Sequence, residues 1–74
     1  MERFILEIYE PNSTSTVLAH IETAAALPIA AGETLRTGLL VTDQPDRVLR
    51  VTRIENIFFQ SPEGWVSKRM VYTE

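Results

Sequence analysis

Residues 47–60, RVLRVTRIENIFFQ, form the longest stretch of the chain with the pattern of a β-strand. Leu49 and Val51 are two positions apart, so their side chains lie on the same face of a pleated strand. Ile54 falls out of this alternation. A flat strand therefore cannot bury these three apolar side chains against one core.

A β-bulge near Thr52 or Arg53 would bring Ile54 back to the face of Leu49 and Val51. Such a bulge adds one residue to the strand, which resets the alternation and bends the strand. A long, bent strand with apolar residues on both faces is typical of a small curled sheet. The stretch therefore predicts a bulged central strand in a sheet that curls on itself.

Four further segments alternate as strands do. The expected strands cover residues 3–10, 17–23, 33–42 and 65–73. Clear turns are predicted at residues 43–46 and 61–64, where Pro45 and Pro62 preset the backbone. The run from Ala24 to Leu27 permits a short helical turn or an irregular connector, because Pro28 disfavours helical geometry at Leu27.

These segments predict an all-β domain over residues 1–74, with at most one short helical turn at Ala24–Leu27. Sequential strands usually pair, so the simplest topology is a five-stranded antiparallel meander. Strands of this number and size tend to curl into a partly open barrel, which removes exposed edges. The expected core consists of Leu6, Ile21, Leu35, Leu49, Val51, Ile54 and Val71.

The buried face of the first and last strands is less clear, because both faces carry apolar side chains. In residues 65–73 we favour Val66, Met70 and Tyr72 as the inward set, with Lys68 as its exception. The opposite register meets a similar difficulty at Arg69. The alternation alone leaves both registers open.

Residues 27–55 resemble small bacterial and phage proteins with SH3-like barrels, many of which are uncharacterised. The resemblance lies in Leu27-Pro28, in the Gly32-Glu33-Thr34-Leu35 turn and in the spacing of Leu49, Val51 and Ile54. It implies an SH3-like fold and no catalytic residue. The segment from Thr37 to Asp46 departs from the pattern, because it is longer than the usual tight connection.

The composition narrows the range of functions. The chain has 74 residues, no cysteine and a formal net charge of −3, which disfavours a nucleic-acid partner. No apolar run approaches the roughly 18 residues that span a bilayer, and the first residues lack the pattern of a signal peptide. We therefore expect a soluble, cytoplasmic protein without a membrane, metal or cofactor partner.

Candidate catalytic residues are few. His20 is the only histidine, and it shares a strand face with Glu22. A general base or a metal ligand needs convergent partners, so an ordinary surface or hydrogen-bonded histidine is the simpler interpretation. The sequence contains no cysteine nucleophile, phosphate-binding loop or dinucleotide fingerprint. We therefore expect a non-enzymatic protein.

The most informative polar and aromatic residues flank the turn at residues 61–64. The candidate interaction surface comprises Phe58, Phe59, Trp65, Arg50, Arg53, Lys68 and Arg69. A basic strip with aromatic side chains can bind single-stranded nucleic acid, whereas a solvated outer face is the simpler interpretation. Phe58 and Phe59 are adjacent in a strand, so at least one of them faces away from the core.

Two functional hypotheses follow. The first is a module that acts through protein contacts, including a weak homodimer formed by apolar side chains at Phe58, Phe59 and Leu39–Val41. The second is a small barrel that binds single-stranded nucleic acid. The acidic net charge favours the first hypothesis.

Overall fold

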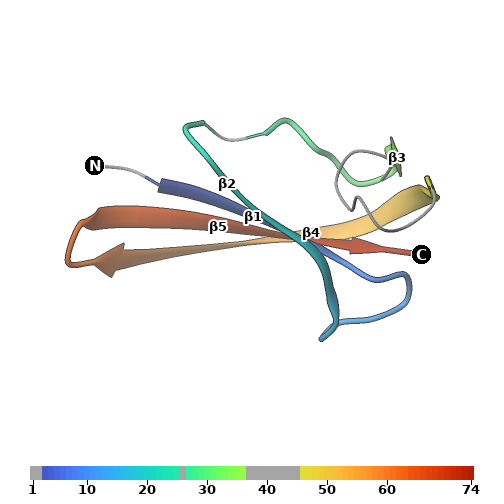
Figure 1. The fold of residues 1–74 in the computed structure, drawn as a ribbon, viewed down its shortest axis with the longest axis horizontal. Coiled ribbons are helices and arrows are strands. Elements are labelled where there is room, and N and C mark those ends of the chain that lie inside the picture. Colours follow the sequence, from blue (N-terminus) through green and yellow to red (C-terminus); the bar gives the residue numbers. More distant parts are fainter. Residues whose placement is uncertain (1–2, 26, 37–45) are drawn as a thin grey trace.

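The computed structural model describes residues 3–25, 27–36 and 46–74, and it contains five strands (Figure 1). They are β1 (Arg3–Tyr9), β2 (Val17–Thr23), β3 (Thr34–Arg36), β4 (Val48–Ser61) and β5 (Gly64–Thr73). No helix occurs in these described ranges, so the all-β prediction is confirmed for them, and none of their segments is a helix that could cross a membrane. The expected run Leu39–Val41 lies outside the described residues.

The five strands form one curled sheet in the order β2-β1-β5-β4-β3. The predicted antiparallel meander is wrong, because β1 and β5 pair in parallel, from Arg3 opposite Val66 to Ile8 opposite Val71. β2 and β3, which follow each other in the chain, lie at opposite edges of the sheet. The segment between them packs Ile29 against the core, so the chain crosses the sheet instead of returning as a hairpin.

The predicted bulge in the central strand is confirmed. Val51 lies opposite Thr73 and Arg53 lies opposite Tyr72, so Thr52 is the extra residue. The Thr52 hydroxyl donates a hydrogen bond to the Tyr72 carbonyl oxygen at 3.2 Å. This shift places Ile54 opposite Val71 and returns Ile54 to the core face of β4.

The core lies on the face of the sheet that the β2–β3 connection crosses. Its buried members are Leu6, Ile8, Ala19, Leu49, Val51 and Val71. Four of the seven predicted core residues are in this cluster, and the other three, Ile21, Leu35 and Ile54, are partly buried against it. Ile8 and Ala19 face each other across β1 and β2 and complete the cluster.

The predicted inward set of β5 is on the wrong face. Val71 lies beside Ile8 in the core, whereas Met70 lies beside Glu7 on the opposite face. Val66 and Met70 are nevertheless buried. The twisted sheet buries side chains on both faces, so alternation along β5 could not identify the core side.

The chain before β3 closes one end of the core by bonding to the outer edge of β4. The Gly32 N–H donates to the Val51 carbonyl oxygen, and the Val51 N–H donates to the Glu33 carbonyl oxygen, both at 2.8 Å. Gly32 adopts a positive φ of 91°, which L side chains rarely adopt. The glycine therefore allows the turn that brings this backbone to the bulge.

Replacing Gly32 by alanine should lower the free energy of unfolding by about 1–2 kcal/mol, measured by chemical denaturation. The cause is conformational, because a Cβ atom at this position meets no other atom within 4 Å. Gly32→Asn should cost less, since asparagine tolerates positive φ better than alanine. Equal losses in the two variants would contradict this explanation.

Candidate interaction surface

The β4–β5 hairpin is the most extended part of the molecule. Its strands pair from Val51 opposite Thr73 to Ser61 opposite Gly64. Figure 1 shows its tip projecting beyond the start of β1. The Ser61 hydroxyl donates to the Gly64 carbonyl oxygen at 2.9 Å and closes the turn. The described part of β1 pairs with β5 from Val66 to Val71, so the hairpin extends past it as two strands only near Ser61–Trp65.

Four large apolar side chains are exposed on the two faces of this hairpin. We call Ile57, Phe58, Phe59 and Trp65 the hairpin surface. Phe58 is 70% exposed and Trp65 is 55% exposed, while Ile57 and Phe59 are close to half exposed. Phe58 lies opposite Ser67, whose small side chain covers little of the aromatic ring. Phe59 lies on the face opposite the core, so the prediction that at least one of the two phenylalanines faces away from the core is confirmed.

The candidate interaction surface derived from the sequence does not include Ile57, although the predicted bulge indicated where Ile57 would lie. The bulge that returns Ile54 to the core also turns Ile57 and Phe59 to the opposite face. Phe59 is opposite Val66 there, and Ile57 is opposite Lys68. Applying the predicted bulge to every later residue would have placed Ile57 outside.

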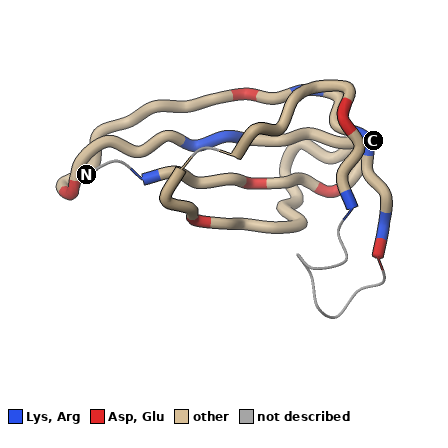
Figure 2. Tube along the Cα trace, turned by 90° about the horizontal axis from the view of Figure 1, so that it is seen from above, with Lys and Arg blue, Asp and Glu red and all other residues tan. Residues whose placement is uncertain are grey.

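The expected basic strip is not assembled in the structure. Arg53 stacks over the Tyr72 ring, 4.5 Å from its centroid, and approaches Glu55 at 3.3 Å. Arg50 lies 3.8 Å from Glu74. Figure 2 shows acidic and basic positions interspersed along the strands.

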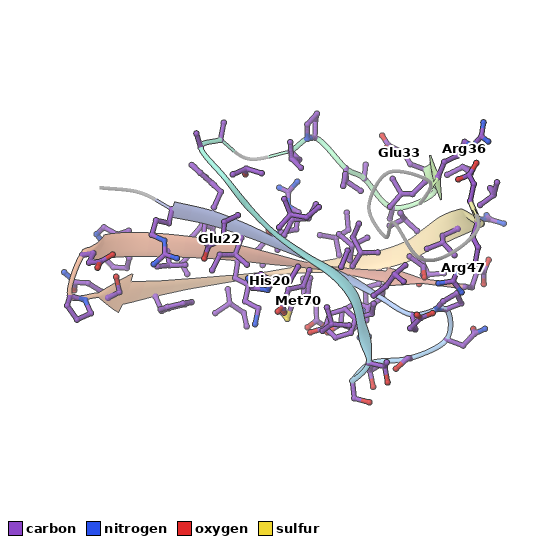
Figure 3. The ribbon with its side chains drawn as sticks, viewed as in Figure 1. His20, Glu22, Glu33, Arg36, Arg47 and Met70 are labelled. Carbon is purple, nitrogen blue, oxygen red and sulfur yellow. The ribbon has the colours of Figure 1, made fainter. Side chains whose placement is uncertain are left out.

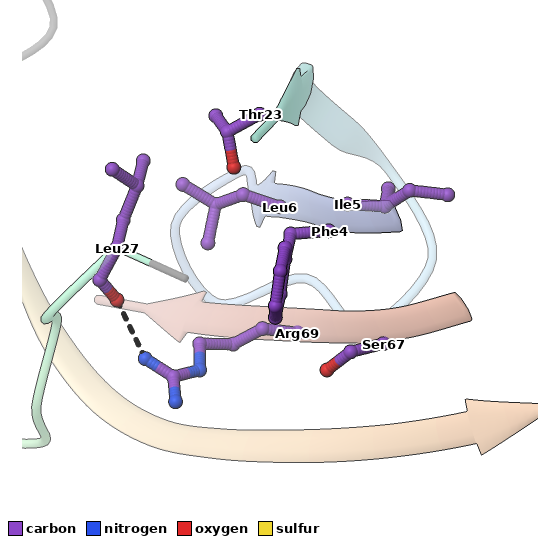
Figure 4. Close-up of a pocket in the computed structure, with 7 residues that line it drawn as sticks. All are labelled: Phe4, Ile5, Leu6, Thr23, Leu27, Ser67 and Arg69. Carbon is purple, nitrogen blue, oxygen red and sulfur yellow. Dashed lines mark hydrogen bonds between the residues drawn. The ribbon is translucent and has the colours of Figure 1, made fainter. Parts of the chain in front are cut away.

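Arg69 lies on the core face, away from Lys68. Its guanidinium donates to the Leu27 carbonyl oxygen at 2.6 Å and to Asn56 Oδ1 at 3.1 Å. Figure 4 shows this side chain beneath the connecting segment, where it lines a cavity of about 20 Å³ together with Phe4. That volume holds one water molecule and no larger ligand. The two hydrogen bonds of Arg69 link the connecting segment to the sheet.

Lys68 belongs to a polar cluster centred on Glu7, which is only 9% exposed. Lys68 Nζ lies 2.8 Å from Glu7 Oε1, and His20 Nδ1 lies 3.0 Å from Glu7 Oε2. The Tyr9 hydroxyl donates to Glu7 Oε1 at 3.4 Å. His20 and Met70 flank Glu7 on the two neighbouring strands, and both are visible near the strand crossing in Figure 3.

Burial alone would raise the pKa of the Glu7 carboxyl, but hydrogen bonds from Lys68 and His20 outweigh this effect and lower the pKa. The same contact with Glu7 raises the pKa of the Lys68 ammonium. Burial raises the pKa of the Tyr9 hydroxyl. The cluster thus holds a charged pair at neutral pH and explains how a lysine fits among buried neighbours.

The Glu7 cluster has a structural role. Tyr9 stacks on Tyr72 with ring centroids 4.8 Å apart, which covers the cluster on the β5 side. Both Glu7 oxygens already have nitrogen partners within the protein. Among the described residues, no group of three or more His, Cys, Asp or Glu side chains is arranged to hold a metal ion.

Comparison of the chain with protein-family models, with curated proteins and with solved structures found no match. The resemblance to SH3-like barrels therefore stays a prediction.

Proposed function

We propose that this protein is a non-enzymatic interaction module that presents its hairpin surface to another protein chain. The observation that carries this proposal is the exposure of four large apolar side chains on the β4–β5 hairpin, with Phe58 and Trp65 on one face and Ile57 and Phe59 on the other. Clusters of exposed apolar side chains of this kind mark protein contacts, and aromatic residues dominate the energy of such contacts.

The charges of the described residues support a protein partner over a nucleic acid. Arg50, Arg53 and Lys68 each have a carboxylate neighbour within 4 Å, which reduces their attraction for phosphates. Arg69 is engaged beneath the connecting segment. The aromatic side chains at the hairpin therefore lack the basic surroundings that single-strand binding uses.

Position-specific photo-cross-linking in the native cell tests this function. Phe58 is replaced by a photoreactive phenylalanine derivative, and Val48 is replaced in the same way as the control. Val48 lies on the same strand and is 65% exposed, so it is about as accessible as Phe58. We expect a protein adduct from position 58 and none from position 48.

Two outcomes would overturn the proposal. One is the absence of any adduct from position 58. The other is an adduct with nucleic acid, together with binding to labelled single strands that weakens steeply as salt is raised. The second outcome would assign the hairpin surface to a nucleic-acid partner.

A further inference from the structure

The described residues cover the outer edge of β4 over only part of its length. β3 pairs with Val48–Arg50, and the Gly32–Glu33 backbone bonds to Val51. This cover ends at the Thr52 bulge. Within the described part of the chain, no strand continues along the edge from Arg53 to Ser61. Such an edge presents alternate N–H and C=O groups that can pair with another strand.

Arg53 and Glu55 are charged residues close to the bulge, but the part of this edge nearer the hairpin turn lacks the devices that usually prevent pairing. Natural edges are commonly protected by proline, by charged side chains or by a bulge. Residues 56–60 contain no proline and no charge, and the bulge at Thr52 precedes them. They also carry Ile57, Phe58 and Phe59, three of the four residues of the hairpin surface.

The order of side chains in this segment is symmetric about Phe58. Asn56 and Gln60 are amides at its ends, and Ile57 and Phe59 are large apolar residues inside them. A two-fold axis perpendicular to the sheet, passing beside Phe58, would pair two copies of this edge antiparallel. This operation keeps each face of the sheet continuous, so the opposed side chains share a face.

We propose that two copies of the chain join through this edge in the register centred on Phe58. This inference rests on the proposed function and names its partner as a second copy. Ile57 of one copy lies opposite Phe59 of the other, and the two Phe58 side chains face each other. Asn56 lies opposite Gln60. Each pair therefore matches apolar with apolar or amide with amide, which stabilises cross-strand neighbours.

Neighbouring registers are worse matched. Centring the axis on Ile57 places the Glu55 carboxylate opposite Phe59. Centring it on Asn56 places the Arg53 guanidinium opposite Phe59. Both arrangements place a charged group opposite the Phe59 ring. In the register centred on Phe58, that ring lies opposite Ile57 instead. Centring the axis on Phe59 places Phe58 opposite the Gln60 amide. The chemistry of the edge therefore favours pairing with a second copy in the register centred on Phe58, and the product is a continuous sheet across both protomers.

Sedimentation at rising protein concentration tests the association. The mass should rise from 8.4 kDa toward twice that value by about 1 mM. Phe58→Lys places two like charges across the axis and should raise the dissociation constant by about 30-fold or more. Val48→Lys, on the covered part of β4, should leave it unchanged. Because both positions are exposed, both variants should keep the melting temperature of the native chain.

Disulfide trapping tests the register, because the chain contains no cysteine. In oxidised glutathione, a mixture of Asn56→Cys and Gln60→Cys proteins should form a cross-linked heterodimer. Each variant alone should form none. Two copies of the same position lie four residues apart along the paired edge, about 13 Å, which is beyond disulfide reach.

A mass fixed near 8.4 kDa at every concentration overturns the dimer, and so does a Phe58→Lys protein that still associates. Cross-linking of Asn56→Cys with itself overturns the register. A monomer whose position 58 captures a different protein overturns the dimer and leaves the proposed function standing. A monomer that gives no adduct at position 58 overturns both the dimer and the proposed function.

Discussion

Replacing Val51 by alanine should lower the free energy of unfolding by about 1–3 kcal/mol. Val51 is 1% exposed and lies in the core beside the bulge. Removing its two methyl groups loses apolar burial and leaves a cavity that the surrounding side chains fill only in part. A domain of this size is marginally stable, so the loss would unfold much of the population near physiological temperature.

Val48→Ala is the matched control, because it makes the same change three positions earlier in the same strand. Val48 is 65% exposed, so its loss should stay within about 0.5 kcal/mol. Urea denaturation of the three proteins measures the difference. Equal losses at the two positions would show that the face of β4 assigned to the core is wrong.

Replacing Lys68 by methionine should cost about 1–3 kcal/mol at neutral pH, because it removes the charged hydrogen-bond partner of a buried carboxylate. The cost stays below that of breaking a fully buried pair, since 30% of the Lys68 side chain is exposed. Arg50→Met is the control. Arg50 is mostly exposed and lies 3.8 Å from Glu74, so its loss should be within about 0.5 kcal/mol.

The pH dependence of stability should change in a specific direction. The pKa of Glu7 is lowered in the folded protein, so the stability from its ionised form is present above the ordinary value of 4.5 and is lost as pH falls through the lowered pKa. Without Lys68, the effect of burial is opposed mainly by His20, and the Glu7 pKa rises. The acid loss of stability should therefore begin at a higher pH in Lys68→Met.

At alkaline pH, the stability contributed by the pair falls as the pH rises. The pKa of Lys68 is raised in the fold, so its contribution is present below the ordinary value of 10.5 and is lost as pH rises through the raised pKa. In Lys68→Met, the free energy of unfolding should therefore lose this part of its decrease at alkaline pH. Unfolding curves across pH, with NMR titration of the Glu7 carboxyl, measure both sides. If the native chain and Lys68→Met lost stability over the same acidic pH range, the role assigned to the Glu7–Lys68 pair would be contradicted.

Local order along the chain was sufficient to predict four of the strands and the bulge, whereas the strand expected at residues 33–42 is described only as Thr34–Arg36. Leu49, Val51 and Ile54 are close in sequence, and only an extra residue lets one strand bury all three. Pro62 and Gly64 mark the hairpin turn for a similarly local reason. The outward position of one phenylalanine in the Phe58–Phe59 pair also follows from alternation alone.

Strand order could not be obtained in this way. The parallel contact of β1 with β5 joins the two ends of the chain, and no local residue pattern encodes which distant strand becomes a neighbour. Lys68 was the one charged residue in the predicted inward set of β5. Its partner Glu7 is remote in sequence, so the sequence did not show what would stabilise a buried lysine. For the same reason, the basic residues near the hairpin could not be assigned to separate faces before their partners were known.

Local sequence patterns were enough to predict that the protein is built from strands, where the central strand bends, and that an aromatic side chain near the turn faces away from the core. These features depend on spacing between near neighbours. The tertiary structure was needed to show that the tip of the β4–β5 hairpin projects beyond β1 and that, among the described residues, no strand covers the outer edge of β4 after Thr52. The physical reason is that exposure and edge pairing depend on which strands lie alongside, and that choice is made by contacts between distant parts of the chain.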